Sequence, residues 1–298
     1  MGALPSGWLK RVLPGLSPEE RLVRCREGGW EALLLDPDGA EDRREWTRLI
    51  QWLRDGPLEV SAVQAGPLPF LEEGGGGETG SGLASPSPEE REAALEEVRR
   101  ALDLARKSGC PRILLRPGRL PMGPGWKGDL RWHREGAEEK LARVEASRKE
   151  GRDRALDRLC RLLHELSREA DGAVFCLRNG FDLAGLDRAE DLAAVVEDLG
   201  SRRVRVWADV QAAASREWAG DGALGDLLDE TAPFLEGVSL GDATPQEVGL
   251  LPGTGRLDLP LVKEYLKAPG LARPWVLEVG VSYGWDSLSL ARKELEGL

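Results

Sequence analysis

The chain has 298 residues, of which 41% are hydrophobic, and a formal net charge of −11. This length suits one large α/β barrel, which typically needs about 250 residues, or two ordinary domains. The negative charge argues against a general nucleic-acid-binding protein, which normally presents a basic face. No apolar run approaches the roughly 20 residues that span a bilayer, and the first residues lack the apolar core of a signal peptide. The sequence therefore predicts a cytoplasmic protein with no nucleic-acid or membrane partner.

Short apolar runs alternate with amphipathic stretches, a pattern typical of βαβ units in a parallel sheet. The predicted strands are 30–36, 58–64, 111–116, 172–178, 203–209, 235–240 and 275–279. The predicted helices are 18–28, 43–54, 88–107, 151–170, 188–199, 224–230, 260–267 and 287–295. A closed barrel needs an eighth strand, and we expect it at 7–13, weak or degraded because Lys10 and Arg11 interrupt the apolar run.

Two long connections interrupt what is predicted to be a single domain over residues 1–298. Residues 72–88 (EEGGGGETGSGLASPSP) predict a flexible loop rich in Gly, Ser and Pro, and no GK[ST] follows that would favour a phosphate loop. Residues 117–150 predict a long loop and a charged helix over the barrel mouth, with Lys127 and His133 on the loop. His133 is either a residue that reaches the mouth or an ordinary solvent-facing histidine.

The four cysteines, Cys25, Cys110, Cys160 and Cys176, are widely spaced and include no Cys-x-x-Cys pair. This spacing does not fit a zinc site, and we expect mainly buried thiols.

The most informative pattern lies in the last third of the chain, in GVSLGD at 237–242, LPGTGRLDL at 251–259 and WVLEVG at 275–280. Each strand-like run ends in a polar tip, and the strand tips of a parallel barrel meet at one mouth. In strand order, the sequence resembles the sugar-phosphate isomerase/epimerase family, the xylose-isomerase-like barrels. The resemblance implies an α/β fold that is a single (β/α)8 TIM barrel, with a site at the mouth.

Members of that family typically hold a divalent metal through Glu, Asp, His and Glu on late strands, and the two glutamates move the substrate's proton. The corresponding positions here are Arg178, Asp209, Ser239 and Glu278. A guanidinium accepts no hydrogen bond and is effectively never deprotonated, so Arg178 cannot ligate a metal. We therefore expect no metal cofactor, with Arg178 in a bidentate arrangement between Asp209 and Glu278.

The resemblance leaves several functions open, including whether the chain is an enzyme. The first is a pseudoenzyme that binds a sugar-like or sugar-phosphate ligand, or pairs with an active paralogue or another copy of itself. Its expected ligand contacts are Arg178, Asn179, Gln211, Ser239, Asp242, Arg256, Lys127 and His133. The alternative is an active sugar isomerase or epimerase that holds Mn²⁺, Mg²⁺, Co²⁺ or Zn²⁺ through Asp209 and Glu278. A metal-independent enzyme with Glu278 as base and Arg178 steadying the enediolate lies between them.

Overall fold

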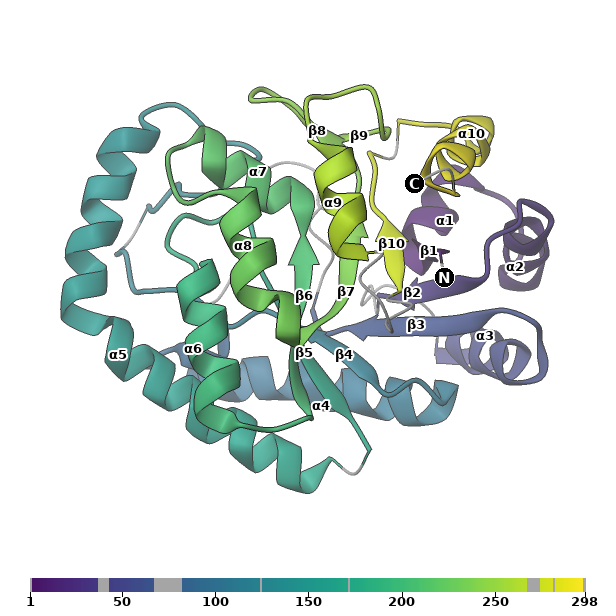
Figure 1. The fold of residues 1–298 in the computed structure, drawn as a ribbon. Coiled ribbons are helices and arrows are strands. Elements are labelled where there is room, and N and C mark those ends of the chain that lie inside the picture. Colours follow the sequence, from purple (N-terminus) through teal and green to yellow (C-terminus); the bar gives the residue numbers. More distant parts are fainter. Residues whose placement is uncertain are drawn as a thin grey trace.

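The structure is a computed structural model that describes residues 2–36, 43–66, 82–123, 125–170, 172–266, 274–280 and 282–296. Its centre is a closed barrel of parallel strands in the spatial order β1-β10-β7-β6-β5-β4-β3-β2 (Figure 1). The barrel strands are β1 (Gly2–Pro5), β2 (Ala32–Leu35), β3 (Glu59–Gln64), β4 (Arg112–Leu115), β5 (Val174–Arg178), β6 (Val204–Asp209), β7 (Leu235–Leu240) and β10 (Trp275–Leu277). The predicted TIM barrel is confirmed, and it closes through β1.

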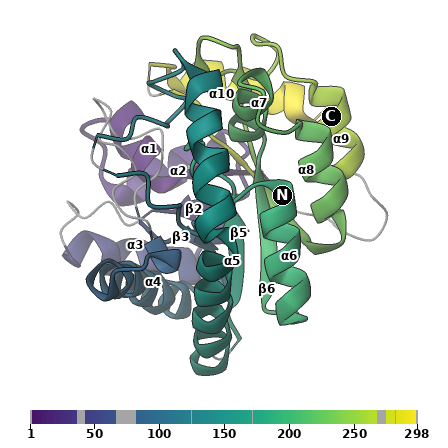
Figure 2. The same cartoon turned by 90° about the vertical axis from the view of Figure 1, so that its left-hand side faces the viewer.

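The helices cover the outside of the barrel (Figures 1 and 2). They are α1 (Ser6–Val12), α2 (Pro18–Glu27), α3 (Arg43–Asp55), α4 (Pro88–Ser108), α5 (Ala137–Glu169), α6 (Ala189–Leu199), α7 (Val210–Trp218), α8 (Leu224–Thr231), α9 (Leu259–Leu266) and α10 (Trp285–Glu296). A short antiparallel pair, β8 (Asp242–Ala243) and β9 (Val248–Leu250), follows β7. None of the helices that the structure describes is long and apolar enough to traverse a lipid bilayer.

The expected position of the first strand was wrong. β1 is the short segment GALP, and most of the segment 7–13 forms helix α1. Strand β1 pairs with β10 through Gly2 and Trp275 and with β2 through Ala3 and Ala32. A Cβ atom at Gly2 would lie 2.6 Å from the Trp275 ring, so the close approach of the two strands requires glycine there. A strand of only four residues, GALP, gives little hydrophobic pattern to recognise.

Helix α5 runs without a break over 33 residues, from Ala137 to Glu169. The prediction divided this segment into a charged helix on the long loop and a second helix beginning at Gly151, because glycine usually marks a helix boundary. Figure 2 shows α5 along the outside of the barrel beside α6. The preceding loop therefore extends only from residue 117 to residue 136.

The long Gly/Ser/Pro-rich connection is only partly described, and its residues 72–81 lie outside the described residues. The described part contains the 3₁₀ turn Gly82–Ala84 and then Ser87, whose hydroxyl caps helix α4 by accepting a hydrogen bond from the Glu90 amide. The last seven residues of the connection are therefore ordered as the entry into α4.

The cysteines behave as the spacing predicted, because all four are free and three are buried. Burial raises the pKa of Cys25 to about 12 and that of Cys110 to about 11. Such thiols stay protonated near neutral pH and act as small apolar side chains.

Candidate functional site

Arg178, Asp209 and Glu278 meet at the mouth of the barrel. Arg178 ends β5, Asp209 ends β6, and Glu278 directly follows β10, whose register is fixed by a hydrogen bond from the Glu278 amide to the Leu240 carbonyl. Nη2 of Arg178 lies 2.6 Å from Oδ2 of Asp209 and 2.6 Å from Oε2 of Glu278. The predicted ion pairs are therefore present, but one nitrogen makes both, and the arrangement is not bidentate.

The Arg178 guanidinium keeps unused hydrogen-bonding capacity although it is only 1% exposed. Two of its five N–H groups serve the carboxylates, while Nε and Nη1 have no hydrogen-bond partner in the part of the chain that the structure describes. Burial lowers the pKa of Arg178, but the carboxylates of Glu278 and Asp209 outweigh burial and raise it above the ordinary arginine value. The residue is a permanent cation with three free donors.

Every carboxylate oxygen of the two acids already accepts a hydrogen bond. Oε1 of Glu278 accepts one from the Ser239 hydroxyl at 2.8 Å, and that hydroxyl accepts one from Nε1 of Trp207 at 2.9 Å. Oδ1 of Asp209 accepts from the backbone amides of Gln211 and Ala212, both at 3.1 Å, and so caps helix α7. A continuous series of hydrogen bonds thus links Trp207, Ser239, Glu278, Arg178 and Asp209 to the start of α7.

Asn179 and Gln211 are buried and hold backbone in place around this cluster. The Asn179 side chain accepts from the Asp209 amide at 2.7 Å and donates to the Asp209 carbonyl at 2.9 Å. The Gln211 side chain donates to the Glu278 carbonyl at 2.8 Å and accepts from the Gly249 amide at 2.6 Å. Both side chains therefore position the acids and the β8–β9 hairpin, and both lie next to the expected ligand site.

Asp242 organises the turn that follows the hairpin. Its carboxylate accepts hydrogen bonds from four backbone amides, those of Ala243, Gly253, Gly255 and Leu257, at 2.8 to 3.1 Å. Arg256 is exposed on this turn, and its backbone amide donates to the Ala243 carbonyl at 2.8 Å. Asp242 therefore stabilises the backbone of this turn, and the Arg256 side chain extends into solvent.

The loop of residues 117–136 is fastened to the connection that follows β5. Isolated β-bridges join Arg119 to Gly185 and Asp129 to Asp182. The Asp182 carboxylate also accepts from Nε1 of Trp126 at 2.8 Å and from Arg119 at 3.0 Å.

The two candidate residues on this loop are Lys127 and His133. Lys127 is exposed and His133 is half-buried. Within the described residues, neither side chain forms a hydrogen bond or ion pair with Arg178, Asp209 or Glu278.

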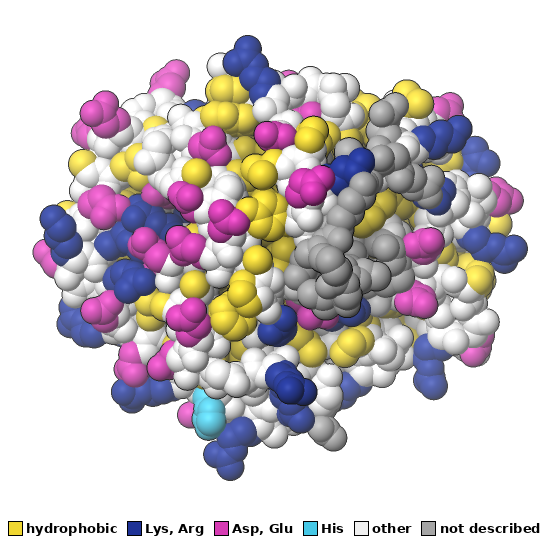
Figure 3. Space-filling view, in the orientation of Figure 1, with side chains coloured by type: hydrophobic (Ala, Val, Ile, Leu, Met, Phe, Trp, Pro, Cys, Tyr) yellow, Lys and Arg dark blue, Asp and Glu magenta, His cyan; other side chains and the backbone are white. Residues whose placement is uncertain are grey.

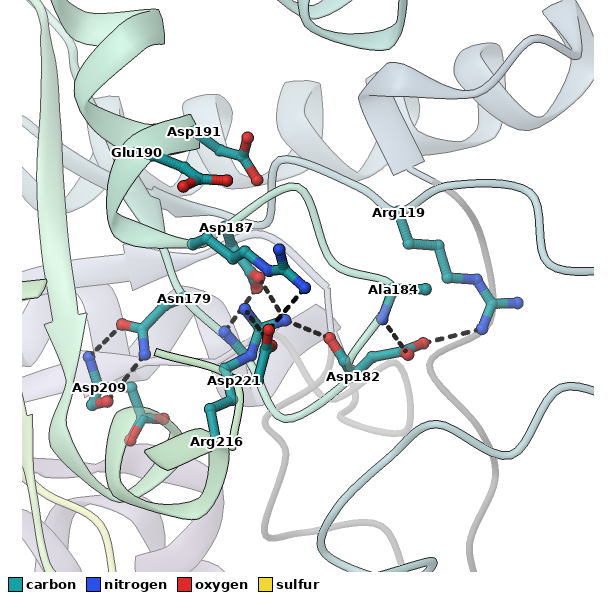
Figure 4. Close-up of polar contacts among 12 residues, drawn as sticks. Arg119, Asn179, Asp182, Ala184, Asp187, Glu190, Asp191, Asp209, Arg216 and Asp221 are labelled. Atoms are coloured by element: carbon teal, nitrogen blue, oxygen red, sulfur yellow. Dashed lines mark hydrogen bonds and ion pairs between the residues drawn. The ribbon is translucent and has the colours of Figure 1, made fainter. Parts of the chain in front are cut away.

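A second buried cluster, centred on Arg216 of α7, was not predicted (Figure 4). Its Nη2 lies 2.8 Å from Asp187 and also donates to the Asp182 carbonyl, and its Nη1 lies 3.5 Å from Asp221. Burial lowers the pKa of Arg216, but the carboxylates, Asp187 foremost, raise it overall. The sequence signal for this cluster is that Asp182, Asp187 and Asp221 stand in short connections between predicted strands and helices.

The site does not fit the divalent metal that the family resemblance implies. Among the described residues, no three His, Cys, Asp or Glu side chains are grouped so that they could hold a metal ion. Arg178 places a cationic nitrogen in contact with both surviving acids, and a hydroxyl stands at Ser239 where imidazole is expected. These side chains form an internal cluster of ion pairs and not a set of metal ligands.

Comparisons with known proteins agree with this fold. A family model described as xylose isomerase-like TIM barrel matches residues 28–298. A D-psicose 3-epimerase structure determined in the presence of D-fructose is similar with a TM-score of 0.69 at 14% identity, covering 99% of this chain and 97% of that one.

Two further solved structures show the same likeness. The D-psicose 3-epimerase of Clostridium cellulolyticum H10, solved with D-tagatose, gives a TM-score of 0.65 at 16% identity over 97% and 88% of the two chains. The IolI protein with a bound zinc atom gives 0.65 at 12% identity over 99% and 96%. No curated protein matches the sequence.

Proposed function

Because the matching family model spans residues 28–298, this chain belongs to the xylose isomerase-like TIM barrel family, and we propose that it is a diverged member that binds a sugar-like ligand without metal-dependent proton transfer. The observation that carries the proposal is the position of Nη2 of Arg178, 2.6 Å from both Asp209 and Glu278. A guanidinium cannot be displaced by deprotonation, and it repels a divalent cation placed beside the same two acids.

The free donors of Arg178 indicate what kind of ligand the mouth would take. Three buried N–H groups of a fixed cation need oxygen acceptors, and leaving them unpaired costs free energy. Hydroxyl and carbonyl oxygens of a sugar supply such acceptors, and similar proteins have been solved with D-fructose and D-tagatose. The cluster carries a formal charge of −1, from one arginine and two acids, which favours an uncharged sugar over a phosphate ester.

The remaining expectations stay predictions. They concern Asn179, Gln211, Ser239 and Asp242 as ligand contacts, pairing with an active paralogue or a second copy, and a cytoplasmic location.

A metal-independent proton transfer is the second candidate. In it, Glu278 takes the proton from the carbon next to a substrate carbonyl, and the free N–H groups of Arg178 stabilise the oxygen of the resulting enediolate. The contact between Glu278 and a cation with unused donors favours this version. It predicts exchange of a substrate C–H proton with solvent deuterium in the presence of a chelator.

An active metal enzyme that uses Asp209 and Glu278 is the third candidate. It predicts stoichiometric metal in the purified protein, detectable by elemental analysis, and loss of that metal in Glu278→Gln.

The decisive experiment measures thermal stability in EDTA with ketoses, aldoses and their phosphates. We expect a saturable upward shift with at least one uncharged sugar. Arg178→Lys keeps a positive charge between the acids but removes the guanidinium donors, so it should fold and lose the shift. Arg161→Lys is the matched control, because Arg161 is 75% exposed on α5. A sugar response that requires added metal, or one that Arg178→Lys retains, would contradict the proposal.

A further inference from the structure

A cavity separate from the barrel-mouth cluster lies among helices α6, α7 and α8. Its volume is about 160 Å³, the share of roughly five water molecules. Asn179 and Arg216 belong to its wall, whereas Arg178, Asp209 and Glu278 do not. Figure 4 shows Arg216, Asp187 and Asp221 converging in this part of the molecule.

The inner wall of the cavity offers buried polar atoms that lack partners. Arg216 is 4% exposed, and its Nε and Nη1 have no hydrogen-bond partner among the described residues, although Nη1 keeps the ion-pair contact with Asp221. Nε of Arg188 and Oδ2 of Asp221 are likewise buried without hydrogen bonds. Donors outnumber acceptors at this wall, so an occupant must bring an oxygen acceptor to avoid the cost of unpaired groups.

The charges of the inner wall cancel, while those of the rim do not. Arg188 and Arg216 balance Asp187 and Asp221 inside. The rim acids are Glu190, Asp226 and Glu230, all exposed. Glu190 accepts a hydrogen bond from Arg148 at 2.5 Å, but Asp226 and Glu230 of α8 make no ion pair within the described chain.

Figure 3 shows acidic side chains gathered beside basic ones on the face formed by α5, α6 and α8. The exposed acids Asp226 and Glu230 at the opening of the cavity attract positive charge.

We propose that this cavity binds a small organic cation that also carries an oxygen acceptor, the chemistry of an amino alcohol. The oxygen accepts from the free N–H groups of Arg216 and Arg188, and the ammonium group lies at the rim beside Asp226 and Glu230. A divalent metal does not fit, because the described residues offer no suitable group of three ligands. An anion does not fit either, because the rim acids would repel it.

Three small probes separate the two features of this site. Ethanolamine has both the ammonium group and the hydroxyl, ethylamine lacks the hydroxyl, and ethylene glycol lacks the charge. Ligand-observed NMR and calorimetric titration of the full chain should show saturable binding of ethanolamine that is at least several-fold tighter than that of either analogue.

Rim substitutions test the location. Asp226→Asn and Glu230→Gln change exposed side chains, so the fold should survive, and each should weaken ethanolamine binding roughly threefold to fivefold, as expected for one partly solvated ion pair. Glu165→Gln, on the exposed face of α5, is the control and should leave binding unchanged. Arg178→Lys should also leave it unchanged, which keeps this test independent of the proposed sugar site.

The outcomes are distinct. Preference for ethanolamine that falls in the rim variants supports the site. Equal binding of the three probes, no saturable binding, or binding that the rim variants leave intact would overturn it and identify the cavity as a hydrated gap between helices.

Discussion

The clusters around Arg178 and Arg216 look alike in composition but differ in what they join. Each is a buried arginine between acidic side chains, and each leaves Nε and Nη1 without a hydrogen-bond partner in the described chain. The acids of Arg178 stand on barrel strands or directly after them, where pairing with neighbouring strands sets their positions. The acids of Arg216 stand in the connections around α6, α7 and α8.

This difference separates two uses of a buried ion cluster. At the mouth, rigid strands place the acids, and Arg178 offsets part of the negative charge of a site whose geometry the strands already set. In the outer cluster, the ion pairs join connections that belong to no barrel strand, and they act together with the two isolated β-bridges that hold the connection after β5. Substitutions in the first cluster should therefore change what the site can bind, and substitutions in the second should change whether its surroundings are ordered.

Arg178→Glu should give the largest effect and should be reversible by metal. It places a third carboxylate against Asp209 and Glu278, so we expect the free energy of unfolding in EDTA to fall by about 5 kcal/mol or more. Three carboxylates form an oxygen donor set, so added Mn²⁺ should restore part of the loss. Urea denaturation with EDTA and with Mn²⁺ measures both effects. Unchanged stability without any gain in metal binding would refute the charge-balancing role of Arg178.

Arg216→Met should destabilise the protein nearly as much but without any response to metal. It leaves Asp187 and Asp221 buried without their central cation, a change that typically costs about 3–5 kcal/mol. Denaturation should show the loss, and limited proteolysis should locate it to the connections at 180–188 and 219–223. Arg161→Met is the exposed control, expected to change stability by less than about 1 kcal/mol. If Arg216→Met also lost less than about 1 kcal/mol, the helices would order these connections without help from the ion pairs.

Ser239→Ala tests the hydrogen-bond chain behind Glu278. The change removes the donor to Oε1 of Glu278 and leaves the indole N–H of Trp207 buried without an acceptor. We expect a loss of about 1–3 kcal/mol by urea denaturation, since an unpaired buried donor costs its desolvation. Ser282→Ala, at an exposed position, should be neutral. If Ser239→Ala were as neutral as Ser282→Ala, the contacts of Ser239 would contribute nothing to the free energy of unfolding.

The sequence predicted the Arg178 cluster because the fold itself brings strand ends together. Once the strands carrying Arg178, Asp209 and Glu278 were recognised from their apolar runs, the barrel geometry placed their ends at one mouth, and the resemblance to the family's metal-binding positions singled out these three residues. The single-nitrogen contact could not be predicted, because it depends on the side-chain conformation of Arg178.

The features that sequence reasoning missed depend on local geometry. Helix α7 begins directly after β6 with Asp209 as its cap, so a residue assigned only to the site also starts a helix. The Arg216 cluster depends on the paths of two connections, and the spacing of hydrophobic residues does not encode these paths. Strand β1 is the four-residue segment GALP, too short for an alternating pattern, and its place in the barrel is set by pairing with β2 and β10.

Trp126→Phe should have the smallest effect and decides whether the loop of residues 117–136 is fixed or moves over the mouth. Phenylalanine keeps an aromatic ring for Arg143, which lies 5.4 Å from the Trp126 ring, but loses the hydrogen bond to Asp182. We expect a loss of about 1 kcal/mol in denaturation. The two backbone bridges to the β5–α6 connection remain, so sugar affinity should not change.

The exposed Trp132 provides the matched control, and Trp132→Phe should be neutral in both measurements. A change in sugar affinity in Trp126→Phe alone would show that the loop takes part in binding. Lys127 and His133 would then return as ligand contacts, because the loop carries both, and the contrast between a rigid mouth and a loop-supporting outer cluster would no longer hold.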